Sequence, residues 1–236
     1  MEDIDAIAAL QDPVRRRLYE YVAAQGREVG RNEAAEAAGV ARTLAAHHLD
    51  KLTEAGLLES GSRRLTGRSG PGAGRPAKVY TRAAGERSVS LPARDYRTAA
   101  ELLAEAAEQA GLDAALCAAA RRRGEALRGP AAPCGDLGEA MEILAARGYE
   151  PHLEDPAEDC GEDGAGTATG AAATPVVRMR NCPFHAVAER FPPLVCGMNL
   201  ALLEGLLGTD GSVRARMDAR PGECCVVVES SKNNER

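Results

Sequence analysis

The sequence predicts an α+β protein with three consecutive parts. Apolar residues recur at helical spacing through most of residues 1–128, and short runs with strand character follow in the carboxy-terminal third. Charge also divides the chain, because residues 1–90 hold 14 Lys and Arg against 12 Asp and Glu, and residues 91–236 hold 15 against 23. We assign residues 1–90 to one domain, residues 91–128 to a pair of helices and residues 129–236 to a second, mixed domain.

Composition excludes several classes of protein. The longest stretches without Asp, Glu, Lys or Arg are Gly164–Val177 and Phe191–Leu203, of 14 and 13 residues, and a membrane span needs about 20 apolar residues. The acidic residues Glu2, Asp3, Asp5 and Asp12 near the start of the chain are untypical of a secretory signal. We therefore expect a cytoplasmic protein, in which seven Cys residues favour metal binding or redox chemistry over a disulfide framework.

The first domain has the pattern of a helix-turn-helix. Asn32–Gly39 is a short Ala-rich helix closed by a glycine, Val40 and Ala41 form a turn, and residues 42–55 make a longer amphipathic helix. The second helix of such a pair enters the major groove of DNA, with its early residues nearest the bases. The residues expected on its outer face are Arg42, Thr43, His47 and Lys51.

A basic hairpin follows this helix pair. Residues 57–60 and 76–81 have strand character, and the Gly- and Arg-rich segment Arg63–Arg75 lies between them. On composition alone the segment is equally explained as a solvated charged loop, but its position favours a wing whose arginines meet phosphates or the minor groove. The sequence thus predicts a winged helix-turn-helix that binds double-stranded operator DNA. The wing residues expected at the DNA are Arg63, Arg64, Arg68, Arg75 and Lys78.

The central helices are candidates for an oligomer interface. Two helical patterns, Asp95–Ala110 and Asp113–Arg128, carry leucines and many small residues that permit close helix approach. Winged-helix repressors bind successive half-sites as dimers, so we expect a homodimer held by these helices. The alternative is a helix pair packed within its own domain.

The carboxy-terminal domain carries the candidate chemistry. A strand at residues 176–180 leads to Cys182, which Pro183 places at the N-cap of a helix, where a thiolate is favoured. Cys196 lies in the first turn of the next predicted helix. Cys224-Cys225 begin the last predicted strand, so we expect at most one of that pair to face a site shared with Cys182 and Cys196.

Five segments of the chain carry a resemblance to a known family: Leu10–Leu18, Gly74–Tyr80, Asn181–His185, Val195–Asn199 and Pro221–Cys225. They resemble the SufR-like family of winged-helix repressors, within the ArsR/DeoR-type helix-turn-helix superfamily. In that family a group of Cys residues binds an iron–sulfur cluster, and the state of the cluster switches repression of the cluster-assembly (suf-type) genes. The resemblance implies Cys182, Cys196 and Cys224 as ligands of a cluster, of the 4Fe-4S type, and supplies no Cys for the fourth position. His185, one helical turn from Cys182, is the candidate fourth ligand. The alternatives are a water or small thiol at an open iron, with His185 hydrogen-bonded to a cluster sulfur, or a His185 that only caps its own helix.

Two other functions stay open at this point. A regulator of the same fold could use the Cys and His residues to bind zinc or a small apolar effector. A thiol oxidoreductase is disfavoured because catalytic dithiols usually have CxxC spacing, and adjacent Cys residues are poor geometry for that chemistry. We expect no enzymatic activity.

Overall fold

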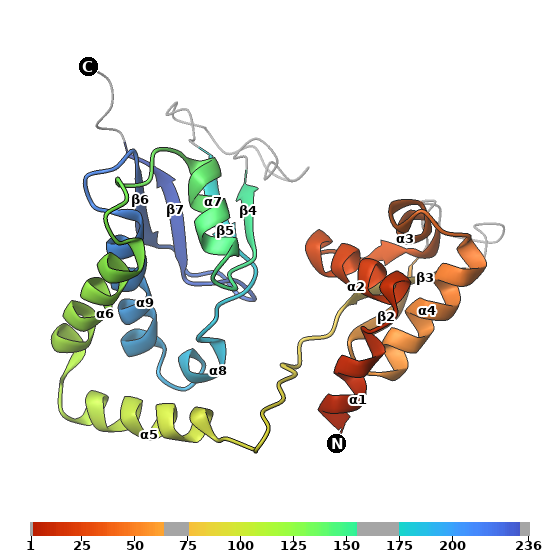
Figure 1. Ribbon diagram of the computed structural model, residues 1–236, viewed down its shortest axis with the longest axis horizontal. Coiled ribbons are helices and arrows are strands. Elements are labelled where there is room, and N and C mark those ends of the chain that lie inside the picture. The colour runs from red at the N-terminus through yellow and green to blue at the C-terminus, as the bar shows by residue number, and fades with distance from the viewer. Residues whose placement is uncertain (1, 64–75, 155–174, 232–236) are drawn as a thin grey trace, which may run out of the picture. The chain divides into compact units, whose positions relative to one another are not determined.

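The computed structural model describes residues 2–63, 76–154 and 175–231 (Figure 1). The chain divides into two compact units, Met1–Arg94 and Asp95–Arg236. The predicted α+β class is confirmed, with a helix-turn-helix in the first unit and a sheet in the second. Within the described ranges no helix combines the length and the apolar composition needed to cross a bilayer.

The first unit combines short helices with a small antiparallel sheet. Its helices are α1 (Glu2–Ala9), α2 (Pro13–Gln25), α3 (Arg31–Ala38) and α4 (Arg42–Glu54). Its strands are β1 (Val29–Gly30), β2 (Leu58–Arg63) and β3 (Ala77–Arg82), in the order β1-β3-β2. The two-residue strand β1 was not predicted, because it is too short to show alternation and exists only through pairing with Val79 and Tyr80.

Local sequence signals explain where these helices begin and end. The Asp12 carboxylate accepts hydrogen bonds from the amides of Val14 and Arg15, each 2.9 Å long, and so caps α2. Gly39 ends α3 in the left-handed region at φ 65°, where a side chain would be strained. The turn into α4 follows directly. Buried side chains including Leu18, Leu49 and Tyr80 then join the helices to the sheet.

The second unit packs helices on a four-stranded antiparallel sheet. Its helices are α5 (Tyr96–Gln109), α6 (Asp113–Arg128), α7 (Leu137–Ala145), α8 (His185–Ala188) and α9 (Pro192–Leu207). Its strands are β4 (Pro151–Glu154), β5 (Val176–Met179), β6 (Val213–Met217) and β7 (Val226–Ser230), in the order β4-β5-β7-β6. Leu144 of α7 and Leu203 of α9 share one core with sheet residues such as Val177 and Val228.

Helix α6 lies against α9 along its length (Figure 1). Two glycines allow this approach, since a Cβ atom at Gly124 would collide with the carbonyl oxygen of Leu202, and one at Gly205 with that of Arg121. The small residues of α6 therefore pack within the second unit. This corresponds to the alternative given for the central helices, in which they pack within their own domain.

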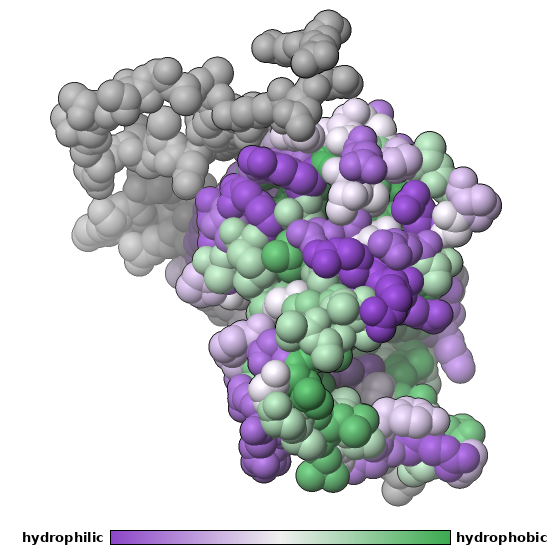
Figure 2. Space-filling model, turned by 90° about the vertical axis from the view of Figure 1, so that its left-hand side faces the viewer, coloured by the Kyte–Doolittle hydropathy of each residue, from purple (hydrophilic) through white to green (hydrophobic). Residues whose placement is uncertain are grey.

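Helix α5 is different, because none of its residues is buried. Ala104 and Ala107 lie beside the small apolar cluster around Phe191. Leu102 and Leu103 instead remain 62% and 72% exposed. Figure 2 shows hydrophobic side chains gathered at the bottom of the face it presents, the level at which Figure 1 draws α5. This helix thus offers an apolar surface that the second unit leaves uncovered.

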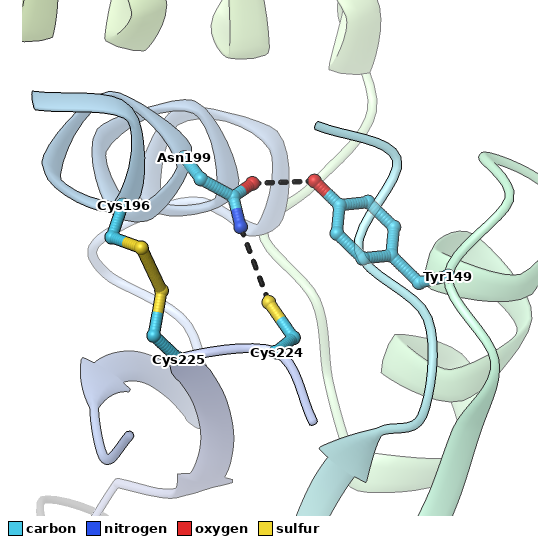
Figure 3. The surroundings of a disulfide bond; sticks show 5 residues. All are labelled: Tyr149, Cys196, Asn199, Cys224 and Cys225. Carbon is cyan, nitrogen blue, oxygen red and sulfur yellow. Dashed lines mark hydrogen bonds between the residues drawn. A yellow bond between two sulfur atoms is a disulfide. The ribbon is translucent and has the colours of Figure 1, made fainter. Parts of the chain in front are cut away.

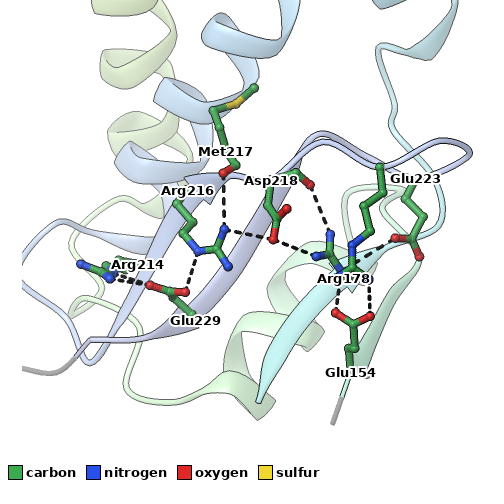
Figure 4. A network of polar contacts seen from close by, with 9 residues as sticks. Glu154, Arg178, Arg214, Arg216, Met217, Asp218, Glu223 and Glu229 are labelled. Atoms are coloured by element: carbon green, nitrogen blue, oxygen red, sulfur yellow. Dashed lines mark hydrogen bonds and ion pairs between the residues drawn. The ribbon is translucent and has the colours of Figure 1, made fainter. Parts of the chain in front are cut away.

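A buried arginine ties the sheet to the segment that precedes β7 (Figure 4). Arg178 of β5 is 1% exposed, and its Nε donates to Glu154 at 2.6 Å while its Nη2 donates to Asp218 at 2.8 Å. The Glu223 carboxylate lies 3.9 Å from the same Nε. Burial opposes ionisation of Glu154 and Asp218, but hydrogen bonds from arginines prevail and lower the pKa of both carboxyls. Arg178 and Arg220 act on Glu154, and Arg216 and Arg178 act on Asp218. Strands β4 and β5, the end of β6 and the Glu223 segment thereby share one charge network.

Replacing this arginine should weaken the second unit. Arg178→Met removes the buried cation that Glu154 and Asp218 share, although Arg220 and Arg216 still pair with them, so we expect a loss of about 3 kcal/mol in the free energy of unfolding. Urea denaturation followed by circular dichroism measures it. The matched control is Arg214→Met, whose side chain is 58% exposed beside Glu229 and should cost under about 1 kcal/mol. Equal losses in the two variants would contradict the role given to Arg178.

Candidate functional site

The outer face of α4 presents the side chains predicted to read DNA. Arg42, Thr43, His47 and Lys51 are all exposed. Leu49 and Leu52 of the same helix are buried in the core. Thr43, His47 and Lys51 follow one another at spacing four and so line one face of the helix. The helix therefore offers a continuous polar edge beside the turn that follows α3.

A groove of about 1130 Å³ lies between this helix pair and the hairpin of β2 and β3. Five basic side chains line it against two acidic ones, so the groove favours an anion such as a phosphate. Four of these basic groups have acidic partners: Arg27 pairs with Glu33, Arg63 with Glu28, and both Arg31 and Lys78 with Asp50. The basic lining residues are Arg27, Arg31, Arg42, Arg63 and Lys78.

An aspartate at the back of the groove organises its lining. The Asp50 carboxylate of α4 accepts hydrogen bonds from Lys78 Nζ at 2.8 Å and from the Tyr80 hydroxyl at 2.7 Å, and pairs with Arg31 at 3.2 Å. Burial opposes the charge, but Lys78 and Tyr80 prevail and lower the pKa of Asp50. Burial and the Asp50 hydrogen bond raise the pKa of Tyr80 to about 12. Lys78 is therefore held at the base of the hairpin by a carboxylate.

The predicted wing residues divide between described and undescribed parts of the chain. Arg63 and Lys78 lie on β2 and β3 at the base of the hairpin. Arg64, Arg68 and Arg75 lie outside the described residues. The sequence reasoning missed Asp50, because a single aspartate on an amphipathic helix is typical of a solvent-exposed position. Its contacts with Lys78 and Tyr80 of β3 form only in the folded chain.

In the second unit, four of the cysteines meet in two pairs beside α9. Cys196 of α9 forms a disulfide with Cys225, with Cα atoms 6.4 Å apart (Figure 3). Cys182 and Cys224 are free thiols that share a hydrogen bond. Thus Cys225 contacts Cys196, and Cys224 contacts Cys182.

The expectation that only one of the adjacent cysteines faces this region is wrong. Strand β7 begins at Val226, so Cys224 and Cys225 precede the strand and the alternation of a pleated strand does not apply to them. Helix α8 likewise begins at His185 rather than at Pro183, so Cys182 lies in the loop before the helix and not at its N-cap.

Hydrogen bonds in the Cys182–Cys224 pair favour a negative charge on Cys182 and a proton on Cys224. The Cys224 thiol donates to Cys182 and, with the amide of Phe184, lowers the pKa of Cys182 to about 7 against the opposing effect of burial. The same contact and burial raise the pKa of Cys224. Near neutral pH the pair is therefore stabilised as one thiolate and one thiol.

A polar residue inside the apolar helix α9 completes the surroundings of Cys224 (Figure 3). Asn199 is 1% exposed, accepts a hydrogen bond of 2.5 Å from the Tyr149 hydroxyl and donates one of 3.4 Å to the Cys224 sulfur. The sequence reasoning missed Asn199 and Tyr149. The available signal was an asparagine within the otherwise apolar run Leu194–Leu203, since a buried amide needs partners.

His185 lies apart from this hydrogen-bonded group. Its side chain is 66% exposed, and its Nε2 lies 3.3 Å from the Glu189 carboxylate of the same helix. The remaining cysteines of the described chain lie elsewhere. Cys134 is buried and its thiol donates to the carbonyl of Asp136. Cys117 on α6 lies against Gly197 of α9.

The donor chemistry can be tested against an iron–sulfur group. Cysteine thiolates are the soft ligands that such clusters use, and four cysteines meet beside α9. Two of the four sulfurs are joined in the Cys196–Cys225 disulfide. Among the described side chains no group of three or more His, Cys, Asp or Glu is placed to hold a metal ion. The residues fit such a group in kind, and reduction of the disulfide would free the two sulfurs that it now holds.

Comparison with known proteins supports the first unit. The family model of a helix-turn-helix domain matches residues 10–61, which run from the end of α1 into β2. No curated protein and no solved structure matches the chain. The match supports DNA-binding transcription regulation as the general function.

Proposed function

We propose that this chain is a cytoplasmic, homodimeric transcriptional repressor that senses iron–sulfur status or oxidants through a cysteine-ligated cluster. Its targets in this proposal are the genes for cluster assembly. The observation that carries the sensing function is the meeting of Cys182, Cys196, Cys224 and Cys225 beside α9. The helix-turn-helix at residues 10–61 supplies the DNA-binding part.

The geometry of the first unit supports contact with a DNA duplex. The exposed face of α4 has the polar side chains that base edges require, and the groove beside it is mainly basic. Arg42 lines that groove from the first turn of α4, where it can approach either a base or a phosphate. Asp50 holds Lys78 in a defined place next to them.

The second unit supports a switch through three segments. Cys182 lies in the loop after β5, Cys196 in the first half of α9, and Cys224 before β7. A cluster bound there would supply a redox-active centre that is lost on oxidation. The chain's own part is to present thiolates, and the pairing of Cys182 with Cys224 already favours one at neutral pH. Segments held to a common group keep their relative positions, and release lets them move.

The resemblance to the SufR-like repressors supplies the direction of the switch. In this proposal the loaded protein binds the operator, and loss or oxidation of the bound group lowers affinity so that the target genes are expressed.

The exposed face of α5 supports the homodimer. Leu102 and Leu103 stand on the one long helix of the second unit that has no buried residue. Covering a leucine side chain contributes about 1.5–3 kcal/mol, and a repressor that reads two half-sites needs a second copy. Helix α6, in contrast, is already covered by α9.

Substitutions on α4 should change sequence discrimination. We expect Arg42→Ala and His47→Ala each to lower the preference for operator over random duplex by about 1–3 kcal/mol, because they remove base contacts. Lys78→Ala should weaken binding to all duplexes alike and reduce the salt slope by about one unit. Titrations of an operator selected from a random pool, at several salt concentrations, measure both effects. The control is Arg122→Ala, which replaces an exposed arginine of α6. If only Lys78→Ala changed the preference for operator over random duplex, the base contacts assigned to Arg42 and His47 and the phosphate contact assigned to Lys78 would be wrong.

Charge on the α5 face should separate the dimer. The double variant Leu102→Asp/Leu103→Asp places carboxylates on the surface that we expect to be buried, so its molar mass in sedimentation equilibrium should be that of a monomer. Leu153→Asp is the control, because Leu153 is also an exposed leucine, 52% accessible on β4. A wild-type monomer, or a double variant that remains dimeric, would exclude this interface.

The cofactor is tested by purification without oxygen in the presence of a thiol reductant. We expect visible absorption with iron and acid-labile sulfide in the wild type, and loss of all three in Cys182→Ser, Cys196→Ser and Cys224→Ser, because each removes a thiolate ligand. Cys117→Ser and Cys134→Ser should keep them. A colourless protein that contains zinc would instead favour the alternative of a zinc-binding regulator.

A further inference from the structure

We infer that Cys225 is the fourth thiolate of the proposed site, in place of His185, and that the Cys196–Cys225 disulfide is the oxidised, closed form of that same site. The inference rests on the proposed function and goes beyond it in two ways. It completes the ligand set within the chain, and it makes metal binding and disulfide formation mutually exclusive uses of the same two sulfurs.

Helix α9 brings the two cysteine pairs together. Cys196 and Asn199 are three residues apart and therefore lie on one face of the helix. Cys225 is bonded to the first, and Cys224 accepts a hydrogen bond from the second. Figure 3 shows both adjacent cysteines directed at α9 from the same segment. Cys182 adjoins this group through its hydrogen bond with Cys224.

The backbone holds Cys224 and Cys225 in place independently of the disulfide. The amide of Cys224 donates to the carbonyl of Met179 on β5 at 2.9 Å, and the carbonyl of Cys225 accepts from the amide of Asp218 at 2.8 Å. Arg178 also attracts Glu223, the preceding residue. Because neighbouring strands fix this segment on both sides, reduction of the disulfide leaves the Cys225 thiol facing Cys196.

His185 lacks these features. It is 66% exposed, and the carboxylate facing its imidazole, that of Glu189, lies on its own short helix. Within the described part of the chain, no hydrogen bond joins the His185 imidazole to Cys182, Cys196, Cys224 or Cys225. Four thiolates are also the donor set of the common four-iron clusters, so no ligand of another kind is required.

The change between the two forms is a balanced two-electron step. A dithiol reductant gives up two electrons and two protons and becomes a disulfide, the Cys196–Cys225 S–S bond breaks, and two thiols form. The thiols lose their protons when they bind metal. In the reverse direction an oxidant such as dioxygen accepts two electrons and two protons from the Cys196 and Cys225 thiols and becomes hydrogen peroxide, and the S–S bond forms again.

The test uses the full chain, reduced with dithiothreitol without oxygen and then supplied with ferrous iron and sulfide. Iron and sulfide per chain are measured at once and during exposure to air. We expect Cys225→Ser to bind less of both, or to lose them at least about tenfold faster than the wild type. His185→Ala and Cys117→Ser should match the wild type. Circular dichroism spectra and thermal unfolding of the chains without iron establish that each variant is folded.

Disulfide mapping gives a second readout that needs no variant. After alkylation of free thiols and proteolysis, the air-exposed chain without iron should contain the Cys196–Cys225 bridge, and the loaded chain should release all four cysteines as alkylated peptides. A bridge that persists in the loaded chain would overturn the inference.

The outcomes separate the inference from the function on which it rests. If the reduced wild type acquires no iron and sulfide, the proposed function fails and the inference fails with it. If the wild type is loaded and Cys225→Ser is equally stable while His185→Ala loses its iron, the cluster stands and the ligand assigned here is wrong.

Discussion

The arrangement of strands in the second unit depends on the neutralisation of one buried charge, that of Arg178. Arg178 lies inside the protein, and a guanidinium there is tolerated only with carboxylate and carbonyl partners around it. Those partners come from β4, from the residue after β6 and from the segment before β7. Satisfying one arginine therefore draws together chain segments that are remote in sequence. The segment at Glu223 is the one that continues into Cys224 and Cys225.

In the first unit a partly exposed carboxylate links elements in a comparable way. Asp50 is a carboxylate surrounded by Arg31, Lys78 and Tyr80, and it links α3, α4 and β3. The hairpin base is thus fixed to the helix that presents Arg42 and His47. In both units a single charged residue sets the position of the residues to which we assign function, although neither is itself a candidate for ligand or base contact.

Cysteine chemistry gives the proposed sensor two alternative states. Thiolates that converge on one place can bind a soft metal centre, and the same convergence allows two of them to form a disulfide. Asn199 and Tyr149 add a buried polar contact on one side of Cys224, and Cys182 lies on the other. The fold thus fixes which cysteines are neighbours, and the redox environment selects between thiolate and disulfide.

The sequence by itself determined most elements of this protein. Asp12 and Gly39 marked helix ends through local hydrogen bonding and backbone freedom, and helical spacing placed α4 with its exposed face. Such signals are local, so they survive without knowledge of the rest of the chain. The starts of α8 and β7 were misjudged by two or three residues, because Pro183 permits a helix without requiring one. A strand likewise begins only where a partner offers hydrogen bonds.

Pairing between distant residues was decided by the tertiary structure alone. Sequence spacing could not tell that Cys225 meets Cys196, that Cys224 meets Cys182, or that Asp50 holds Lys78. Sequence spacing also left open whether α6 packs within its own unit. The close approach of α6 and α9 at Gly124 and Gly205 answers this question, and it is visible only in the structure. These contacts join residues from about 30 to 80 positions apart. They arise from the burial of shared apolar surface and the neutralisation of buried charge, which are properties of the packed chain and of no single segment.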